Sequence, residues 1–375
     1  MTSSPHDTPP TADPDPQRPR LRDGGRLGAL VGWLPALGLV GLLLAMAAGS
    51  ELSAPPAALA AVILFLPHLH AVLAVLAFGI WVLLPDRRAP PTVLGLAVLV
   101  AAVRWGPGWS PVPDPPAGEP LVVMSWNVQR LWGEAEGTPV DCVLSEIKRN
   151  SPDVLALLEV TADDVGALAG QLGMSCRHAP YVGAGPRVGG LAVCTLGDRW
   201  RLRDGSAQRF EDGEDWSYLF AEIEGPTTLF NLLAVHLVPY RVSERDLRRV
   251  WSSGDPSDLL KIGDRGARVT RAQSDQSAAL LARVGKLQDP TIIAGDFNST
   301  RDSALHVALR KTLRDAWERG GRGFGATIRV LGQIPLRVDH VYASREFRVL
   351  EAVVPVAHCS DHQPVVVTLG LPPSS

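Results

Sequence analysis

Cysteine is scarce in this 375-residue sequence, and four residues occur: Cys142, Cys176, Cys194 and Cys359. No pair has the CxxC spacing, and no cysteine–histidine spacing suggests zinc, so a structural zinc site is not expected. If the region with these cysteines lies outside the cytoplasm, one or two disulfides can form; otherwise they are buried free thiols. The sequence alone leaves this choice open.

A basic excess is also missing. The chain has 36 Lys and Arg against 39 Asp and Glu, a formal net charge of −3. From Leu121 onward the balance is 29 against 31. Domains that bind nucleic acid usually carry a basic excess or stripe, so a long polyanion is disfavoured as a partner. A local cluster of basic residues can still bind a phosphate group.

Charge is absent from two long apolar runs near the N-terminus. Leu27–Gly49 contains 23 uncharged residues and Ala57–Leu84 contains 28. About 20 apolar residues suffice to cross a bilayer as a helix, so both runs are predicted to span a membrane. Thr92–Val103 is shorter and is predicted as a third span. Residues 27–105 therefore form a membrane region with three transmembrane helices.

The distribution of arginine predicts the orientation of these spans. Residues 1–26 are polar, rich in proline and aspartate, and end in several arginines, so they are expected to form a disordered cytoplasmic tail. Arg87 and Arg88 flank the spans on the same side, whereas the loop at Glu51 has no Lys or Arg. Three spans place the rest of the chain outside the cell membrane. If the third does not cross, that part is cytoplasmic.

Residues 106–120 are rich in proline and predict an extended, stiff linker, and residues 121–371 read as one globular domain. Eight short apolar runs of this domain predict strands: Leu121–Ser125, Val154–Leu158, Leu191–Cys194, Tyr218–Ile223, Thr228–Val235, Thr291–Ala294, Val338–Tyr342 and Val365–Leu369. Helical periodicity predicts helices at Pro139–Asn150 and Arg268–Val284. This order of elements is consistent with an α/β sandwich.

Polar residues follow the predicted strands in a specific order. They are Asn127, Glu159, His236, Asp296, Asn298, Asp339, Asp361 and His362. A single residue of this kind is usually a turn, a cap or a satisfied surface group. Together they occupy the ends of buried strands, where a sheet scaffold brings distant residues into one cleft. The pattern therefore predicts one site rather than several unrelated turns.

These residue types suit phosphoryl transfer. Mg²⁺ takes oxygen ligands and keeps several waters, so Glu159, supported by Asp361 and Asn127, is a sufficient ligand set. Asp296 and Asn298 are placed to hold the attacking water. His236 and His362 are candidates for contacting the phosphate or moving a proton, and Asp339 is a suitable partner to orient His362.

Six segments resemble the endonuclease/exonuclease/phosphatase superfamily: SWNV (Ser125–Val128), LLEV (Leu157–Val160), AVHL (Ala234–Leu237), AGDFNST (Ala294–Thr300), RVDHVYAS (Arg337–Ser344) and CSDHQPVVV (Cys359–Val367). The resemblance covers about residues 121 to 371. It implies a four-layered α/β sandwich with two packed sheets. It also implies a Mg²⁺ ligand at Glu159 with Asn127 and Asp361 nearby, Mn²⁺ being the alternative metal. The catalytic residues it implies are His236, Asp296, Asn298, Asp339 and His362.

The three predicted spans narrow the resemblance to the VanJ-type membrane proteins associated with resistance to teicoplanin and other glycopeptides. That likeness implies hydrolysis of undecaprenyl pyrophosphate, the lipid carrier of cell-wall synthesis, on the outer face of the cell membrane. A tethered domain without basic excess suits a lipid-borne phosphate better than a nucleic acid. No protein partner can be inferred from the sequence.

An insertion between His236 and Asp296, residues 239–267, is rich in arginine and carries a tryptophan. It is either a solvated loop and helix or a basic lip for anionic headgroups or pyrophosphate. In the second reading Arg248 and Arg249 bind substrate. Arg271 and Gln273, at the start of the next predicted helix, are weaker candidates for contacting phosphate.

Three other functions fit parts of the sequence. A membrane-tethered nuclease would use the same chemistry, as would a phospholipid or sphingomyelin phosphodiesterase. A non-catalytic membrane sensor would keep the fold for binding alone, but the full set of acids, amides and imidazoles disfavours it.

Overall fold

The computed structural model describes residues 108–110, 120–129, 139–181, 189–210, 217–239, 252–253, 255–330 and 334–371. The predicted tail and the predicted membrane region, residues 1–26 and 27–105, lie outside these ranges. Within the described ranges, every helix is too short or too polar to cross a membrane.

The first of two large sheets has six strands in the order β15, β16, β2, β3, β5, β4. They are β2 (Leu121–Asn127), β3 (Val154–Val160), β4 (Ser175–Pro180), β5 (Gly190–Thr195), β15 (Arg348–Val353) and β16 (Val365–Gly370). β2 and β3 run parallel, and the other neighbours run antiparallel. The central strands are buried on both faces, which explains their nearly continuous apolar sequences.

The second sheet has six strands in the order β10, β14, β9, β8, β7, β6. They are β6 (Arg201–Arg209), β7 (Ser217–Glu224), β8 (Leu229–His236), β9 (Thr291–Asp296), β10 (Arg314–Asp315) and β14 (Asp339–Ala343). β8 and β9 are parallel neighbours in its centre. β6 is an edge strand and is largely exposed, so its sequence RLRDGSAQR lacks the apolar alternation of a half-buried strand.

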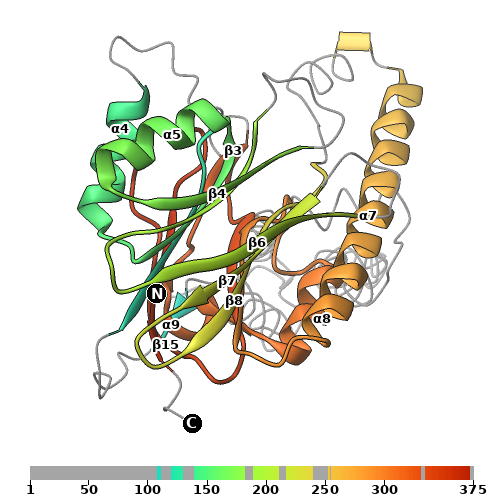
Figure 1. The fold of residues 1–375 in the computed structure, drawn as a ribbon. Coiled ribbons are helices and arrows are strands. Elements are labelled where there is room, and N and C mark those ends of the chain that lie inside the picture. Colours follow the sequence, from blue (N-terminus) through green and yellow to red (C-terminus); the bar gives the residue numbers. More distant parts are fainter. Residues whose placement is uncertain are drawn as a thin grey trace, which may run out of the picture.

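Helices cover the outer faces of both sheets (Figure 1). They are α4 (Pro139–Asn150), α5 (Ala162–Leu172), α7 (Pro256–Val284) and α8 (Ala304–Thr312). The short helix α9 (Ala316–Gly320) instead packs against β14 and β15, with Ala316 and Trp317 in the core between the sheets. One apolar core lies between the sheets, a second packs the first sheet against α4 and α5, and a third packs the second sheet against α7 and α8. The chain is thus a mixed α/β sandwich of two sheets, as the sequence predicted.

The predicted strands and the helix Pro139–Asn150 are confirmed, with ends shifted by up to two residues. The prediction of a helix at Arg268–Val284 was wrong at its start, because α7 begins at Pro256. Asp255 caps this helix by accepting a hydrogen bond from the backbone N–H of Ser257 at 2.8 Å, and proline occupies the first turn. Gly263 and Gly266 interrupt the apolar periodicity between these points. The helical part of the predicted insertion therefore starts well before residue 267.

Two disulfides use all four cysteines. Cys142 of α4 is bonded to Cys359, with 5.8 Å between their Cα atoms. Cys176 and Cys194 are direct cross-strand neighbours on β4 and β5, with 4.1 Å between their Cα atoms. The choice between disulfides and free thiols is therefore settled in favour of disulfides.

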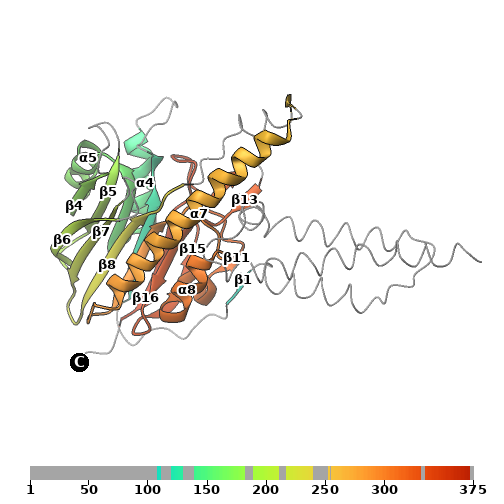
Figure 2. The same ribbon diagram turned by 90° about the vertical axis from the view of Figure 1, so that its right-hand side faces the viewer.

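Two small antiparallel pairs lie beside the sandwich (Figure 2). β1 (Gly108–Trp109) pairs with β11 (Arg322–Gly323), and β12 (Ile328–Val330) pairs with β13 (Ile334–Leu336). β1 lies within the predicted linker. Part of that segment is therefore a strand of the domain.

Candidate active site

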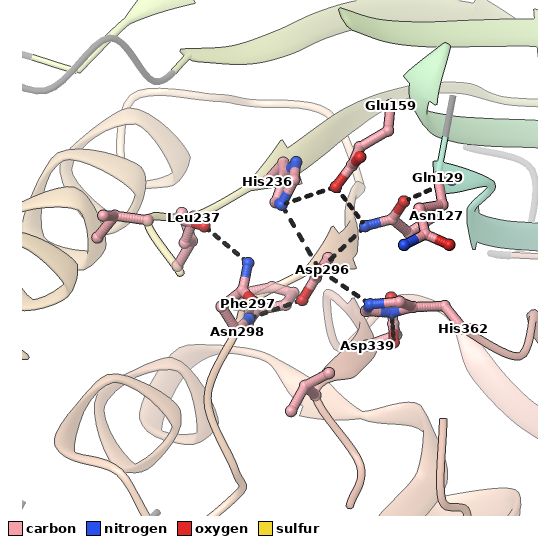
Figure 3. A network of polar contacts seen from close by, with 12 residues as sticks. Asn127, Gln129, Glu159, His236, Leu237, Asp296, Phe297, Asn298, Asp339 and His362 are labelled. Carbon is pink, nitrogen blue, oxygen red and sulfur yellow. Dashed lines mark hydrogen bonds and ion pairs between the residues drawn. The ribbon is translucent and has the colours of Figure 1, made fainter. Parts of the chain in front are cut away.

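Three strand ends of the second sheet place polar side chains in one row. His236 of β8 is aligned with Asp296 of β9, and Asp296 is aligned with Asp339 of β14. Across the sandwich, β2 of the first sheet ends at Asn127. Figure 3 shows these side chains pointing toward a common centre. The structure therefore brings together residues that are up to 235 positions apart, from Asn127 to His362.

Asp296 lies in the middle of this group and is almost completely buried. Its Oδ1 accepts a hydrogen bond from the backbone N–H of Asn298 at 2.8 Å, and its Oδ2 accepts one from Asn127 Nδ2 at 3.2 Å. Burial, followed by the nearby carboxylate of Asp339, raises the pKa of Asp296 to about 7 despite the opposing charge of His362. Asp296 can therefore exchange a proton near neutral pH.

Gly295 allows this position of Asp296. Its φ is +151°, and a Cβ atom added there would collide with the backbone of Val235 on the neighbouring strand. The close approach of β8 and β9 thus requires glycine before the buried aspartate.

Asn127 joins Asp296 to Glu159. Its Nδ2 also donates to Glu159 Oε1 at 3.2 Å, and its Oδ1 accepts from the backbone N–H of Gln129 at 3.0 Å. Glu159 has a φ of +58°, in the left-handed region, and lies where the pairing of β3 with β5 shifts register. Backbone strain of this kind is typical of functional sites, and here it turns a strand-end carboxylate toward the centre.

Asp339 and His362 form a close pair. Oδ2 of Asp339 lies 2.8 Å from Nδ1 of His362, and Nε2 of His362 lies 3.8 Å from Asp296 Oδ2. Burial disfavours the imidazolium form, but the carboxylates of Asp339 and Asp296 outweigh burial and raise the pKa of His362 to about 10. His362 therefore carries a positive charge in the arrangement described.

His236 lies between two carboxylates and a tyrosine. Its Nε2 is 3.6 Å from Asp296 Oδ2 and 3.9 Å from Glu159 Oε1, and its Nδ1 is 2.6 Å from the hydroxyl of Tyr181. Since Nε2 faces carboxylate oxygens, we assign the proton of the neutral ring to Nε2, and Nδ1 then accepts from Tyr181. Sequence reasoning missed Tyr181, because it follows an edge strand whose sequence, SCRHAP, carries no catalytic pattern.

Asn298 shapes the loop that follows Asp296. Its φ is +48°, and its Nδ2 donates to the backbone carbonyl of Leu237 at 2.9 Å. Gln273 of α7 is buried, and its Nε2 donates to the carbonyls of Val238 at 2.9 Å and Asn298 at 3.2 Å. The amide of Gln273 thus fixes the two loops that leave β8 and β9 rather than reaching into the centre.

Two buried histidines contact the backbone of the loop that follows Asp296. Nε2 of His306 and Nε2 of His340 lie 3.1 Å and 3.2 Å from the backbone carbonyl of Ser299. Burial lowers the pKa of both histidines, so both remain neutral. Nothing in the spacing of the sequence indicated this pair, because the two residues come from a helix and a strand that meet only in the folded chain.

The remaining predicted site residues do not belong to the central group of buried side chains in the described part of the chain. Asp361 is exposed on the loop before His362, and its Oδ1 accepts from Ser360 Oγ at 3.4 Å, so the contacts that join the central group do not extend to it. Arg271 is exposed on α7, where its Nε donates to the carbonyl of Ala267 on the same helix at 3.4 Å. Arg248 and Arg249 lie outside the described residues. Their predicted roles stay predictions.

The donors at the centre fit a hard divalent cation. Carboxylate oxygens of Glu159 and Asp296 both face the amide of Asn127, and Oδ1 of Asp339 is buried without a hydrogen-bond partner in the described residues. Oxygens of Asp296 and Asp339 and a ring nitrogen of His362 also lie within 4.8 Å of one another. We give more weight to the carboxylates, since a charged His362 repels a cation and Mg²⁺ prefers oxygen.

A known protein family matches most of the globular domain. A family model described as "Endonuclease/Exonuclease/phosphatase family" matches residues 124–362. No curated protein matches the sequence significantly.

Three solved structures share the fold. The human Nocturnin catalytic domain with bound sulfate anion is 19% identical over 67% of this chain and 94% of its own, with a TM-score of 0.51. The endonuclease/exonuclease/phosphatase from Beutenbergia cavernae DSM 12333 is 20% identical over 68% and 73%, with a TM-score of 0.53. The one from Bacteroides vulgatus is 15% identical over 68% and 100%, with a TM-score of 0.52. At these identities the likeness concerns the fold alone.

Proposed function

Because the chain belongs to the endonuclease/exonuclease/phosphatase family, we propose that it is a membrane-anchored, Mg²⁺-dependent phosphoesterase that hydrolyses undecaprenyl pyrophosphate. The reaction takes place on the outer face of the cell membrane and contributes to glycopeptide resistance of the teicoplanin type. The proposal places the chain nearest to the VanJ-type membrane proteins within the family.

The observation that carries the chemistry is the row formed by His236, Asp296 and Asp339, completed by His362 and Asn127. A buried acid with a raised pKa, a charged imidazole and amide donors around one centre suit the hydrolysis of a phosphate ester. A binding module needs neither the shifted pKa of Asp296 nor the charged pair.

Each residue then has a role in the reaction. The ionised form of Asp296 takes a proton from the attacking water, and the backbone N–H of Asn298 holds the carboxylate in place. Water adds to the terminal phosphorus, and the bond to the bridging oxygen breaks, so that undecaprenyl phosphate and inorganic phosphate leave. His236 donates from Nε2 to a phosphate oxygen, and the positive charge of His362 stabilises the charge on the equatorial oxygens.

Glu159 would hold the divalent cation, with Asn127 and Asp361 as the further ligands proposed from sequence, and Mn²⁺ is the alternative ion. When bound, the cation would neutralise charge on the phosphate oxygens. The carboxylate of Asp339 acts separately, because its Oδ2 holds the imidazole of His362.

Three features of the chain support action outside the cytoplasm on a membrane-borne substrate. The uncharged runs Leu27–Gly49 and Ala57–Leu84 are long enough to span a bilayer. All four cysteines are in disulfides, which persist in oxidising compartments and are rare in the cytosol. The near-neutral charge of residues 121–371 suits a lipid-borne phosphate rather than a long polyanion.

Phosphate release from undecaprenyl pyrophosphate tests the proposal. The purified full chain is assayed with Mg²⁺ beside sphingomyelin and DNA, and the Asp296→Ala variant serves as the inactive control. We expect release from the lipid pyrophosphate alone, with loss in EDTA and in the variant. Preferred cleavage of DNA or sphingomyelin would replace the proposed substrate, and no Mg²⁺-dependent cleavage of any of the three would contradict the enzyme assignment.

A further inference from the structure

The large apolar side chains that are exposed in the described part of the chain lie in two neighbouring segments. Phe324 is 56% exposed, Val353 is 38% exposed and Val356 is 68% exposed. These three residues are here called the apolar rim. Val353 lines a hollow of about 310 Å³, while Phe324 and Val356 lie one and two residues along the chain from its lining residues Gly325 and Val354. The hollow is lined by Trp317, Arg322, Ala326, Glu351 and Val354, among others. Exposed apolar side chains gathered in neighbouring segments point to an interaction face.

The apolar rim adjoins the strand through which the chain enters the domain. β1 pairs with β11, with Gly108 opposite Gly323, the residue before Phe324. On the other side, Gly321 forms a parallel bridge with Ala352, the residue before Val353. The entering strand and both segments of the apolar rim are therefore contiguous.

The length of chain before β1 fixes how far this face can lie from a membrane. The predicted membrane region ends at Trp105, three residues before Gly108. Three residues span at most about 10 Å even when fully extended. If the predicted spans cross the bilayer, β1 and the neighbouring apolar rim must lie at its surface.

Charges near the apolar rim suit an anionic bilayer. Arg322 and Arg329 are exposed on either side of Phe324, while Glu351 is the exposed acid that lines the hollow. Arginine beside exposed apolar side chains favours contact with anionic headgroups, in which apolar groups enter the headgroup–acyl boundary.

The same segment is connected to the candidate active site. Thr327, three residues after Phe324, is fully buried, and its Oγ1 accepts from the backbone N–H of Asp339 at 3.2 Å. The carbonyl of Thr327 accepts from the backbone N–H of Gln363 at 2.7 Å, the residue after His362. One threonine thus holds both halves of the Asp339–His362 pair and joins them to the apolar rim.

We propose that the apolar rim, Phe324, Val353 and Val356, is the surface by which the catalytic domain rests on the lipid bilayer, with its active site at the level of the headgroups. This inference rests on the membrane anchoring in the proposed function and adds the face that meets the lipid. Contact at Phe324 is transmitted through Thr327 to the loop that carries His362.

Direct depth measurement on the full chain tests the contact. Cysteine is introduced at Val356, and, as a matched control, at Ala207, which is exposed on the edge strand β6 on the opposite side of the sandwich from β1 and β11 (Figure 2). The native cysteines are in disulfides, so a fluorophore added without reductant labels the new thiol. The protein is reconstituted in phosphatidylglycerol–phosphatidylethanolamine vesicles with a nitroxide-bearing lipid.

We expect quenching of about twofold or more at position 356 and none at position 207, as for a side chain at the headgroup–acyl boundary. Val356→Asp should lower hydrolysis of vesicle-borne undecaprenyl pyrophosphate about tenfold and leave hydrolysis of a soluble, short-chain prenyl pyrophosphate unaffected, whereas Ala207→Asp should alter neither.

Three results would overturn the inference. Equal quenching at both positions in a chain that resists alkaline carbonate extraction would reject the docking face but keep the anchor. Cross-linking between two copies through position 356 would assign the face to a second copy of the chain instead. Release of the chain by carbonate would reject the anchor itself and the inference with it.

Discussion

The hydroxyl of Tyr181 lies 2.6 Å from Nδ1 of His236, and this contact joins the end of the first sheet to the end of the second. Both side chains are buried. The hydrogen bond leaves Nε2 as the donor toward Asp296 and Glu159, which is the orientation that His236 needs in order to bind a phosphate oxygen.

Tyr181→Phe should therefore reduce turnover more than substrate binding. Loss of one buried hydrogen-bond donor costs about 1–2 kcal/mol, which corresponds to a roughly tenfold lower kcat with a KM close to that of the wild type. Steady-state kinetics checks this, with Tyr218→Phe as the control, since Tyr218 packs in the outer core beside Phe210. Equal losses in the two variants would argue against a role for Tyr181 through His236.

The two disulfides should have different effects on activity. Cys142–Cys359 ties the loop that carries His362 to α4, whereas Cys176–Cys194 joins two strands at the edge of the sheet. Replacing either pair by alanine should lower stability by about 2–4 kcal/mol, but only the Cys142/Cys359 double variant should also lower kcat. Thermal denaturation and kinetics of both variants test this. An unchanged kcat without the Cys142–Cys359 bond would show that the loop is held by its other contacts alone.

Asp296→Asn should strongly reduce activity and stabilise the metal-free protein at alkaline pH. Burial raises the pKa of Asp296 to about 7, so the folded chain favours the protonated form of this carboxyl group. Its favourable contribution to the free energy of unfolding is fully present below the unfolded pKa near 3.8 and is lost as the pH rises through 7. Asparagine does not ionise, so the variant should melt a few degrees higher at pH 8, by about 2–4 °C for each kcal/mol, and the difference should shrink toward pH 4. Activity should fall about a hundredfold or more. A lower melting temperature at pH 8 would contradict the raised pKa.

His362→Gln should show the opposite pH dependence of stability. Since Asp339 and Asp296 raise the pKa of His362 to about 10 against the effect of burial, the charged pair stabilises the fold below pH 6.5 and loses this effect as the pH rises through 10. The metal-free wild type should melt at a higher temperature than the variant. The difference in melting temperature should be largest below pH 6.5 and should become smaller toward pH 10. A gap that does not change with pH would mean that His362 is neutral in the folded chain.

The central strands and the polar residues at their ends could be predicted from the sequence, because each strand is a short apolar run and its polar residue directly follows that run. The strand TIIAGD is buried throughout and ends at Asp296. Its apolar run predicts a buried strand, and the carboxylate directly after that run predicts a polar group at the strand end. The same holds for Asn127 after LVVMSW and for His236 after LFNLLAV.

Other parts depend on contacts that no local pattern records. Tyr181 meets His236 across the two sheets, and Gln273 donates from a helix to three backbone carbonyls in the loops after β8 and β9. Four cysteines allow three pairings, and only the fold selects Cys142 with Cys359. The polar edge strand β6 carries too little apolar alternation to be recognised, since both of its faces are largely exposed.

The central claim is that one cluster around Glu159 and Asp296 binds Mg²⁺ and uses it for hydrolysis. Calorimetric titration of the full chain with Mg²⁺, paired with phosphate release at the same concentrations, tests this claim most directly. We expect one binding event that Glu159→Gln weakens about tenfold or more, with activity following occupancy in both proteins. Wild-type activity that is retained without bound metal, or Mg²⁺ affinity that Glu159→Gln leaves intact, would contradict it.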